Sequence, residues 1–128
     1  MFDFHSAIYN PNMLTESGIL MKDAEAGVSG ELVMVVAGRL TKATPLVTPY
    51  AILNADTVAG TNVVTEYLKV RKDNRYKCDV TGTGTPTIGV QTAAISADGL
   101  SVDAANLTTG KIEIVGYDAV NKKAIVTF

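Results

Sequence analysis

Residues 67–81 read YLKVRKDNRYKCDVT and carry the clearest strand pattern in the chain. Apolar side chains occupy alternate positions on both sides of a polar interruption at residues 72–74, and they are Leu68, Val70, Tyr76, Cys78 and Val80. Because a strand points successive side chains to opposite faces, this pattern predicts a β-hairpin whose apolar residues share one face. A three-residue turn at 72–74 keeps that parity, with Asn74 in a left-handed conformation.

The opposite face of this predicted hairpin is basic. It carries Lys69, Arg71, Arg75 and Lys77, with Lys72 at the turn, so five of the 11 Lys and Arg residues fall within residues 69–77. Three interpretations stay open for this basic face. It is a solvated strand exterior that deters unwanted pairing, a docking surface for an acidic patch on a protein partner, or a contact for nucleic acid.

Composition limits the class of protein. A chain of 128 residues has the length of one domain, and its 47% hydrophobic and 19% charged residues are typical of a globular protein. The longest apolar run, at residues 32–37, is too short to span a bilayer, and the first ten residues do not resemble a secretory signal. A net charge of −2 predicts no general attraction to nucleic acid or to membranes, so we expect neither as a partner.

Few residues suit catalysis or metal binding. The chain has one cysteine, Cys78, and one histidine, His5, which cannot make a Cys/His zinc site or an internal disulfide. The strand pattern assigns Cys78 to the core. The Gly/Thr-rich stretch at 81–87 lacks the third glycine and the following helix of a nucleotide-binding loop. We predict no enzyme, metal site or cofactor, although a carboxylate pair that meets only in space stays open.

Residues 1–30 differ from the rest of the chain. Their apolar residues follow no sustained helical or strand period, and residues 10–12, Asn-Pro-Asn, interrupt any helix. We therefore predict an extended N-terminal arm at residues 1–30 and a single β domain at residues 31–128. The alternative is that the segment supplies a first strand or short helix packed on its own core.

The remaining chain predicts an all-β fold built from consecutive hairpins. We expect a valine-rich strand at 31–37, buried on both faces, to pair with 40–44 through Gly38-Arg39, and a short strand to follow at 50–53. A strand at 88–97 should return from residue 100 through a two-residue turn at Asp98-Gly99. Residues 111–117 and 123–128 form the last predicted hairpin. The pattern indicates a small antiparallel barrel or sandwich and leaves both open.

Three stretches, residues 30–44, 65–80 and 108–128, resemble the decoration proteins of tailed-bacteriophage capsids, also called cement or head-stabilising proteins. The resemblance implies a β body, made in the host cytoplasm, that binds the major capsid protein on the outside of the virion. It also implies a homo-oligomer, with a trimer favoured, whose terminal arms engage neighbours. The partner-binding residues expected on this basis are Phe2, Phe4, Tyr9, Met13 and Leu14 in the arm and Lys69, Arg71, Arg75 and Lys77 on the basic face. The alternative function is a carbohydrate- or ligand-binding β domain.

Overall fold

The protein is all-β, as the sequence predicts. The computed structural model describes residues 1–7, 15–89 and 92–128, with residues 4–7 described by their backbone alone, and within these ranges it contains no helix, and so none that could cross a membrane. The strands are β1 (Asp3–Ala7), β2 (Leu32–Val36), β3 (Arg39–Lys42), β4 (Ala51–Leu53), β5 (Tyr67–Lys69), β6 (Asn74–Thr81), β7 (Thr92–Ile95), β8 (Ser101–Asp103), β9 (Ile112–Asp118) and β10 (Lys123–Thr127).

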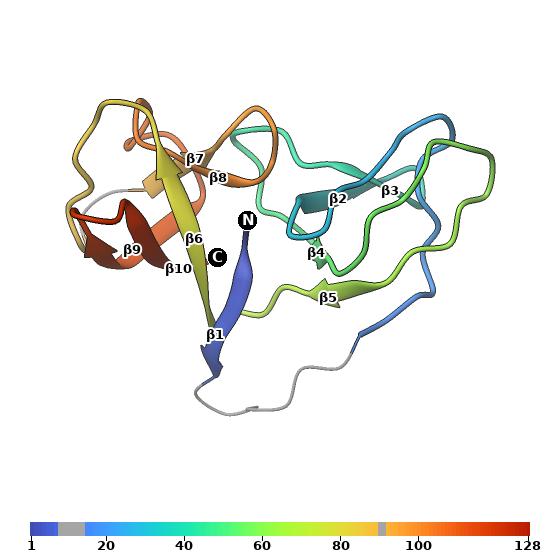
Figure 1. Ribbon diagram of the computed structural model, residues 1–128, viewed down its shortest axis with the longest axis horizontal. Helices are drawn as coiled ribbons and strands as arrows, with labels where there is room; N and C mark the ends of the chain where they lie inside the picture. The colour runs from blue at the N-terminus through green and yellow to red at the C-terminus, as the bar shows by residue number, and fades with distance from the viewer. Residues whose placement is uncertain (8–14, 90–91) are drawn as a thin grey trace.

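Five strands close into a barrel. The larger sheet has the order β1-β6-β10-β9-β7-β8. A further pairing of β8 with β6 closes the five strands from β6 to β8 into a ring. That closing pair is parallel, from Asp79↔Ser101 to Thr81↔Asp103, whereas the other pairs are antiparallel. β1 lies beside the first half of β6 and is an added strand outside the closed ring (Figure 1). The barrel removes open sheet edges, and the choice between barrel and sandwich is made by this one parallel pairing.

A second sheet, of order β3-β2-β4-β5, lies beside the barrel (Figure 1). One face contributes Leu32 and Ile52 to the barrel core. The other face contributes Val33, Leu53 and Tyr67 to a separate apolar cluster that residues before β2 help to cover. Since successive residues of β2 and β4 enter different clusters, this sheet is a layer between two cores.

The predicted hairpin at 67–81 does not form, because its two arms belong to different sheets. β5 pairs with β4, whereas β6 pairs with β1, β8 and β10. A turn does occur between them, closed by the Asn74 amide donating to the Arg71 carbonyl at 3.1 Å, but Asn74 is the buried first residue of β6 and has no left-handed backbone. The chain crosses from one sheet to the other here, and local alternation is the same for a crossing and for a hairpin.

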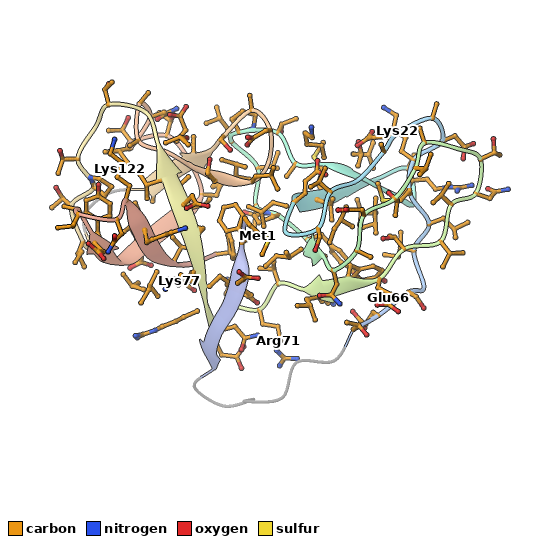
Figure 2. All side chains as sticks on the ribbon, in the orientation of Figure 1. Met1, Lys22, Glu66, Arg71, Lys77 and Lys122 are labelled. Carbon is orange, nitrogen blue, oxygen red and sulfur yellow. The ribbon has the colours of Figure 1, made fainter. Side chains whose placement is uncertain are left out.

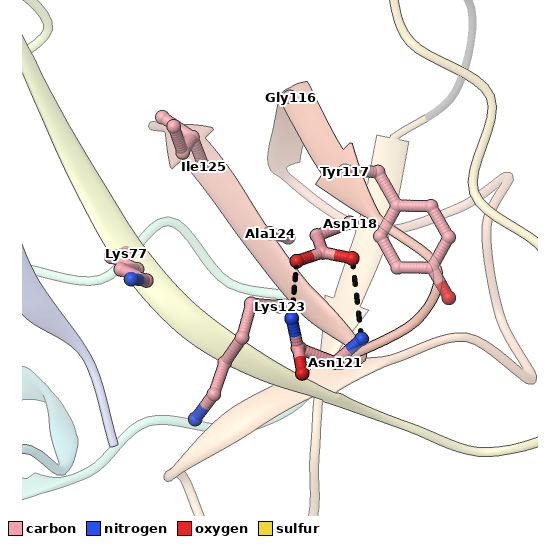
Figure 3. A pocket seen from close by; sticks show the side chains of 8 residues that line it. All are labelled: Lys77, Gly116, Tyr117, Asp118, Asn121, Lys123, Ala124 and Ile125. Atoms are coloured by element: carbon pink, nitrogen blue, oxygen red, sulfur yellow. Dashed lines mark hydrogen bonds between the residues drawn. The ribbon is translucent and has the colours of Figure 1, made fainter.

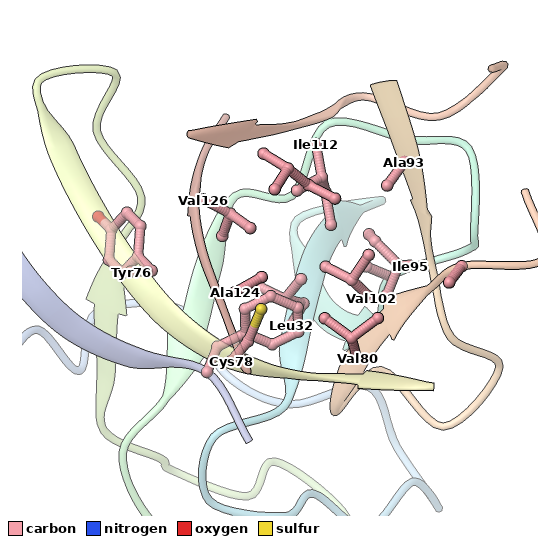
Figure 4. Packing of buried hydrophobic residues seen from close by; sticks show 14 of the residues in the cluster. Leu32, Tyr76, Cys78, Val80, Ala93, Ile95, Val102, Ile112, Ala124 and Val126 are labelled. Atoms are coloured by element: carbon pink, nitrogen blue, oxygen red, sulfur yellow. The ribbon is translucent and has the colours of Figure 1, made fainter. Parts of the chain in front are cut away.

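The alternation itself is confirmed in β6, and Val70 also packs against the barrel core, whereas β5 buries a residue of the opposite parity. Tyr76, Cys78 and Val80 point into the barrel core, as predicted (Figure 4). In β5 the buried residue is Tyr67, and Leu68 is half-buried. Burial raises the pKa of the Cys78 thiol to about 12, so the thiol is protonated at neutral pH and belongs to the core.

The β2–β3 and β9–β10 hairpins are confirmed. The loop of the first lies one residue earlier than predicted, because Ala37 and Gly38 form it, with φ of 49° and 75° as a type I′ turn requires, and Arg39 begins β3. The expectation that residues 31–37 are buried on both faces is wrong in its second half, because Val36 is 51% exposed at the hairpin tip. β9 carries a bulge at Val115, where the pairing with β10 shifts register.

The β7–β8 hairpin also forms, with a longer loop than predicted. The Ser96 amide donates to the Ser101 carbonyl, and only Gly99 in the loop has a positive φ, of 75°. Asp98 accepts hydrogen bonds from the Ser96 hydroxyl and from the Leu100 amide at 3.0 Å. The Asp98 side chain therefore holds a wider loop in place of the two-residue turn.

The described parts of residues 1–30 pack on the rest of the chain. Phe2 is 1% exposed, its ring centroid lies 6.0 Å from that of Phe128, and its amide donates to the Gly30 carbonyl. Further along, Glu16 pairs with Tyr67 at the edge of the second sheet, and Met21 lies in its apolar cluster. These contacts correspond to the alternative in which the segment packs on its own core.

Candidate functional site

The structure divides the predicted basic face between the two sheets. Lys69 lies on β5, with its ammonium 5.4 Å from the centre of the Tyr50 ring. Arg71 lies in the crossing segment, with its Nε 3.3 Å from Asp73 (Figure 2). Arg75 and Lys77 are exposed on β6 and share the outer face of the barrel. Only this last pair keeps the predicted common face.

The predicted arm residues are also divided. Phe2 is buried in the barrel core, so its ring is not part of a contact surface in this conformation. The backbone of Phe4 pairs with Tyr76 in the β1–β6 ladder. Tyr9, Met13 and Leu14 lie outside the described residues.

Strand register places the outer residues of β6, β10 and β9 in rows. In one row Lys77 lies opposite Ile125, and Ile125 lies opposite Gly116. In the next row Lys123 lies between Asp79 and Asp118. Side chains directly opposite each other on one face of a sheet are close enough to interact, so the residues within each row are neighbours on the surface.

Each charged side chain of the second row has a partner within the protein. Lys123 forms an ion pair with Asp79, and the hydrogen bond from Lys123 holds the pKa of the Asp79 carboxyl below its ordinary value. The same hydrogen bond raises the pKa of Lys123. Asp118 accepts from the amides of Val120 and Asn121 and from the Asn121 side chain, at 3.0, 3.2 and 2.7 Å, so its carboxylate closes the β9–β10 turn (Figure 3).

Lys77, in the first row, and Arg75, two residues before it on β6, have no such ion pair, and the interaction of Lys77 with Asp118 acts at longer range. Neither Arg75 nor Lys77 forms an ion pair with any residue that the structure describes, and both side chains are exposed. Asp3 lies opposite Lys77 on β1, yet the two are not an ion pair. Two cations on β6 are thus available to a partner.

A depression of about 570 Å³ lies on this face, and we call it the outer hollow (Figure 3). Its lining residues are Lys77, Gly116, Tyr117, Asp118, Asn121, Lys123, Ala124 and Ile125. It exists because Gly116, next to the β9 bulge, has no side chain to cover its neighbour Ile125. A smaller depression of about 270 Å³ adjoins it and shares Lys77 and Lys123.

The outer hollow combines an apolar surface at Ile125 with charged groups on Lys77, Lys123 and Asp118. Sequence reasoning selected Lys77 alone from this set. The isolated Gly116 within the last predicted strand pair was the signal that could have found the rest, since a glycine inside a strand pattern indicates a bulge or a close approach.

A buried carboxylate lies away from this face, at the start of β2. Glu31 is 2% exposed, accepts from the Val28 amide at 2.9 Å, and lies 3.5 Å from the Lys42 ammonium. Desolvation by burial raises the pKa of Glu31, and the Val28 hydrogen bond and Lys42 oppose that rise only in part. The neutral form of Glu31 is therefore favoured by folding.

We expect the Glu31→Gln variant to be more stable than the unmodified protein at pH 7. Because the pKa of Glu31 is raised in the folded state, its contribution to stability is full below its unfolded pKa near 4.5 and is lost as the pH rises through the folded value. The difference between the two proteins should therefore shrink on acidification to pH 4. Urea unfolding at several pH values measures this, with exposed Glu66→Gln as control. Parallel pH profiles for Glu31→Gln and the unmodified protein would contradict the assignment.

The described residues form a small all-β protein whose barrel carries a depression lined by charged and apolar residues. Within the described residues, no three His, Cys, Asp or Glu side chains cluster as they would around a metal ion. No family model, no curated protein and no solved structure matches the chain.

Proposed function

We propose that this chain is a viral structural protein that binds the outer surface of a tailed-bacteriophage capsid and stabilises its shell. The observation that carries the proposal is the exposed pair Arg75 and Lys77, which forms no ion pair within the described chain and of which Lys77 lines the outer hollow. Uncompensated charge next to an apolar depression on rigid strands suits contact with another protein surface.

The sequence resemblance to capsid decoration proteins indicates which kind of protein the partner is. The three stretches that carry it include β2 and β3, β5 with most of β6, and β9 with β10. The last two stretches supply the strands of the outer face. On this proposal the partner is the major capsid protein, the protein is located on the virion, and a homo-oligomer places several copies of the face on the shell. Many weak contacts then add through avidity.

We expect the protein to co-sediment with capsids of its virus at a fixed copy ratio. Reversing the outer-face charges in the double variant Arg75→Glu/Lys77→Glu should lower the affinity at least about tenfold at low salt and flatten its salt dependence. The matched control is Lys22→Glu/Lys111→Glu, which makes the same change in net charge at two exposed residues away from the outer hollow and should bind nearly as well as the unmodified protein. Absence of the unmodified protein from the capsid pellet would overturn the proposal.

The outer hollow also supports a second candidate, a carbohydrate-binding domain. Asp118 and Asn121 lie at one end of the hollow, and carboxylate and amide groups can hydrogen-bond to the hydroxyl groups of a sugar (Figure 3). Titration with a panel of soluble glycans, followed by the amide resonances of Tyr117 and Asn121, separates this candidate from the first. Asn121→Ala should weaken glycan binding under the second candidate and leave a capsid contact centred on Lys77 largely intact.

A further inference from the structure

We infer that the outer hollow is the docking site for an acidic segment of a protein partner, which places a carboxylate on Lys77 and an apolar side chain over Gly116 and Ile125. This inference rests on the proposed function, in which the partner is a protein, and it names the surface and the chemistry of the segment that the surface accepts.

The apolar half of the site comes from one row of the sheet. Ile125 is half-buried in the middle of the row, and Gly116 beside it leaves the Ile125 side chain uncovered. The side chains of Ala124 and Tyr117 point to the other face of the sheet, toward the barrel core, so Ile125 is the apolar side chain that the hollow offers. A volume of about 570 Å³ holds a large apolar side chain, and covering Ile125 removes apolar surface from water.

The charged half of the site determines the sign of the charge that the partner carries there. Lys123 is already paired with Asp79, and Asp118 is committed to the β9–β10 turn, so Lys77 is the lining cation without an ion pair in the described chain. Arg75 extends the same positive edge along β6. An acidic side chain of the partner is attracted by both Lys77 and Arg75, whereas a basic side chain is repelled by them.

The positions of the charged residues also determine how the bound segment is oriented. Lys77 lies on β6 at one side of the hollow, and Asp118 lies on β9 at the other (Figure 3). A carboxylate near Asp118 would meet like charge, so the acidic residue of the segment lies toward β6 and its apolar residue toward β9. The hollow lies on the outer faces of strands and opens to solvent, which suits a chain segment laid across a surface.

Gly116 provides a variant that fills the hollow while preserving the fold. Its φ is not positive, so other residues can adopt its backbone conformation. A Cβ at this position would meet only the Ile125 side chain, at 3.4 Å and beyond, which is ordinary contact. We therefore expect Gly116→Ala and Gly116→Val to fold, with valine occupying the space that the partner's apolar side chain requires.

The test uses the full chain, labelled with ¹⁵N, and a blocked peptide of sequence EELGEE as the probe. We expect dissociation constants near 1 mM, on the order of a weak single-segment contact, with shifts centred on the amides of Lys77, Gly116, Tyr117 and Ile125. Lys77→Glu and Gly116→Val should each weaken binding at least about fivefold. The exposed Lys111→Glu, which makes the same charge change away from the hollow, should not. The neutral peptide QQLGQQ and the peptide EEAGEE should both bind more weakly than EELGEE.

Absence of shifts at millimolar EELGEE, shifts centred elsewhere, or binding that Lys77→Glu leaves unchanged would each overturn the inference. Urea unfolding of every variant confirms the fold, and Gly116→Ala replaces the valine variant if the latter is destabilised. Failure here is distinguishable from failure of the proposed function, because capsids can still co-sediment with the protein through another face. Conversely, peptide binding without capsid binding keeps the site and removes the capsid as its partner.

Discussion

Gly110→Ala is expected to lower the free energy of unfolding by about 4 kcal/mol or more, at the upper end for a single substitution. A Cβ at residue 110 would lie 1.8 Å from the Ala93 carbonyl oxygen and 2.3 Å from the Ala94 nitrogen. Both atoms belong to the backbone of β7, which is held in the barrel by pairing with β8 and β9. The barrel wall would have to move to admit one methyl group, and overpacking of this kind has no flexible side chain to absorb it.

The measurement is urea unfolding, with soluble yield as the second measurement if the variant does not fold. Gly18→Ala is the matched control, because an added Cβ there would come no closer than 3.9 Å, to the Tyr67 hydroxyl. We expect that control to stay within about 0.5 kcal/mol of the unmodified protein. A Gly110→Ala variant as stable as Gly18→Ala would contradict the close contact between residue 110 and β7.

Phe2→Ala is expected to lower the free energy of unfolding by about 3–5 kcal/mol, the range for removing a fully buried aromatic side chain. Phe2 packs against Phe128, which in turn lies 5.3 Å from the Tyr76 ring, so three aromatic rings from β6 and both ends of the chain share one part of the barrel core. Truncation opens a cavity there and removes aromatic contacts. Thermal and urea unfolding measure the loss, with Phe2→Leu as a conservative control that should cost only about 1 kcal/mol.

This second prediction also separates the two accounts of residues 1–30. If Phe2 packs on its own chain, the loss of stability is independent of protein concentration. If the segment instead binds a neighbouring copy, Phe2→Ala leaves the monomer as stable as before and weakens self-association, which sedimentation velocity over a dilution series detects. The second result would contradict the packing of Phe2 described above.

Alternation of apolar and polar residues is enough to predict the inward-facing side chains of β6. Alternation placed Tyr76, Cys78 and Val80 in the core, and the turn chemistry of the β2–β3 connection and the apolar pattern of β9–β10 predicted two hairpins that form. These features depend on neighbours within a few residues, where strand periodicity and turn preferences act directly. The all-β class follows from the same local signals.

The pairing of strands that are distant in sequence depends on the tertiary structure. Residues 67–81 have the local pattern of a hairpin, yet β5 pairs with β4 and β6 pairs with β10. This arrangement buries Tyr67 in one apolar cluster and Tyr76 in the other. Closure of the barrel by β6 and β8, the burial of Phe2 and the row that joins Lys77 to Ile125 and Gly116 all depend on partners distant in sequence. Alternation fixes the face that a residue occupies, and the packing of the whole chain selects what lies opposite that face.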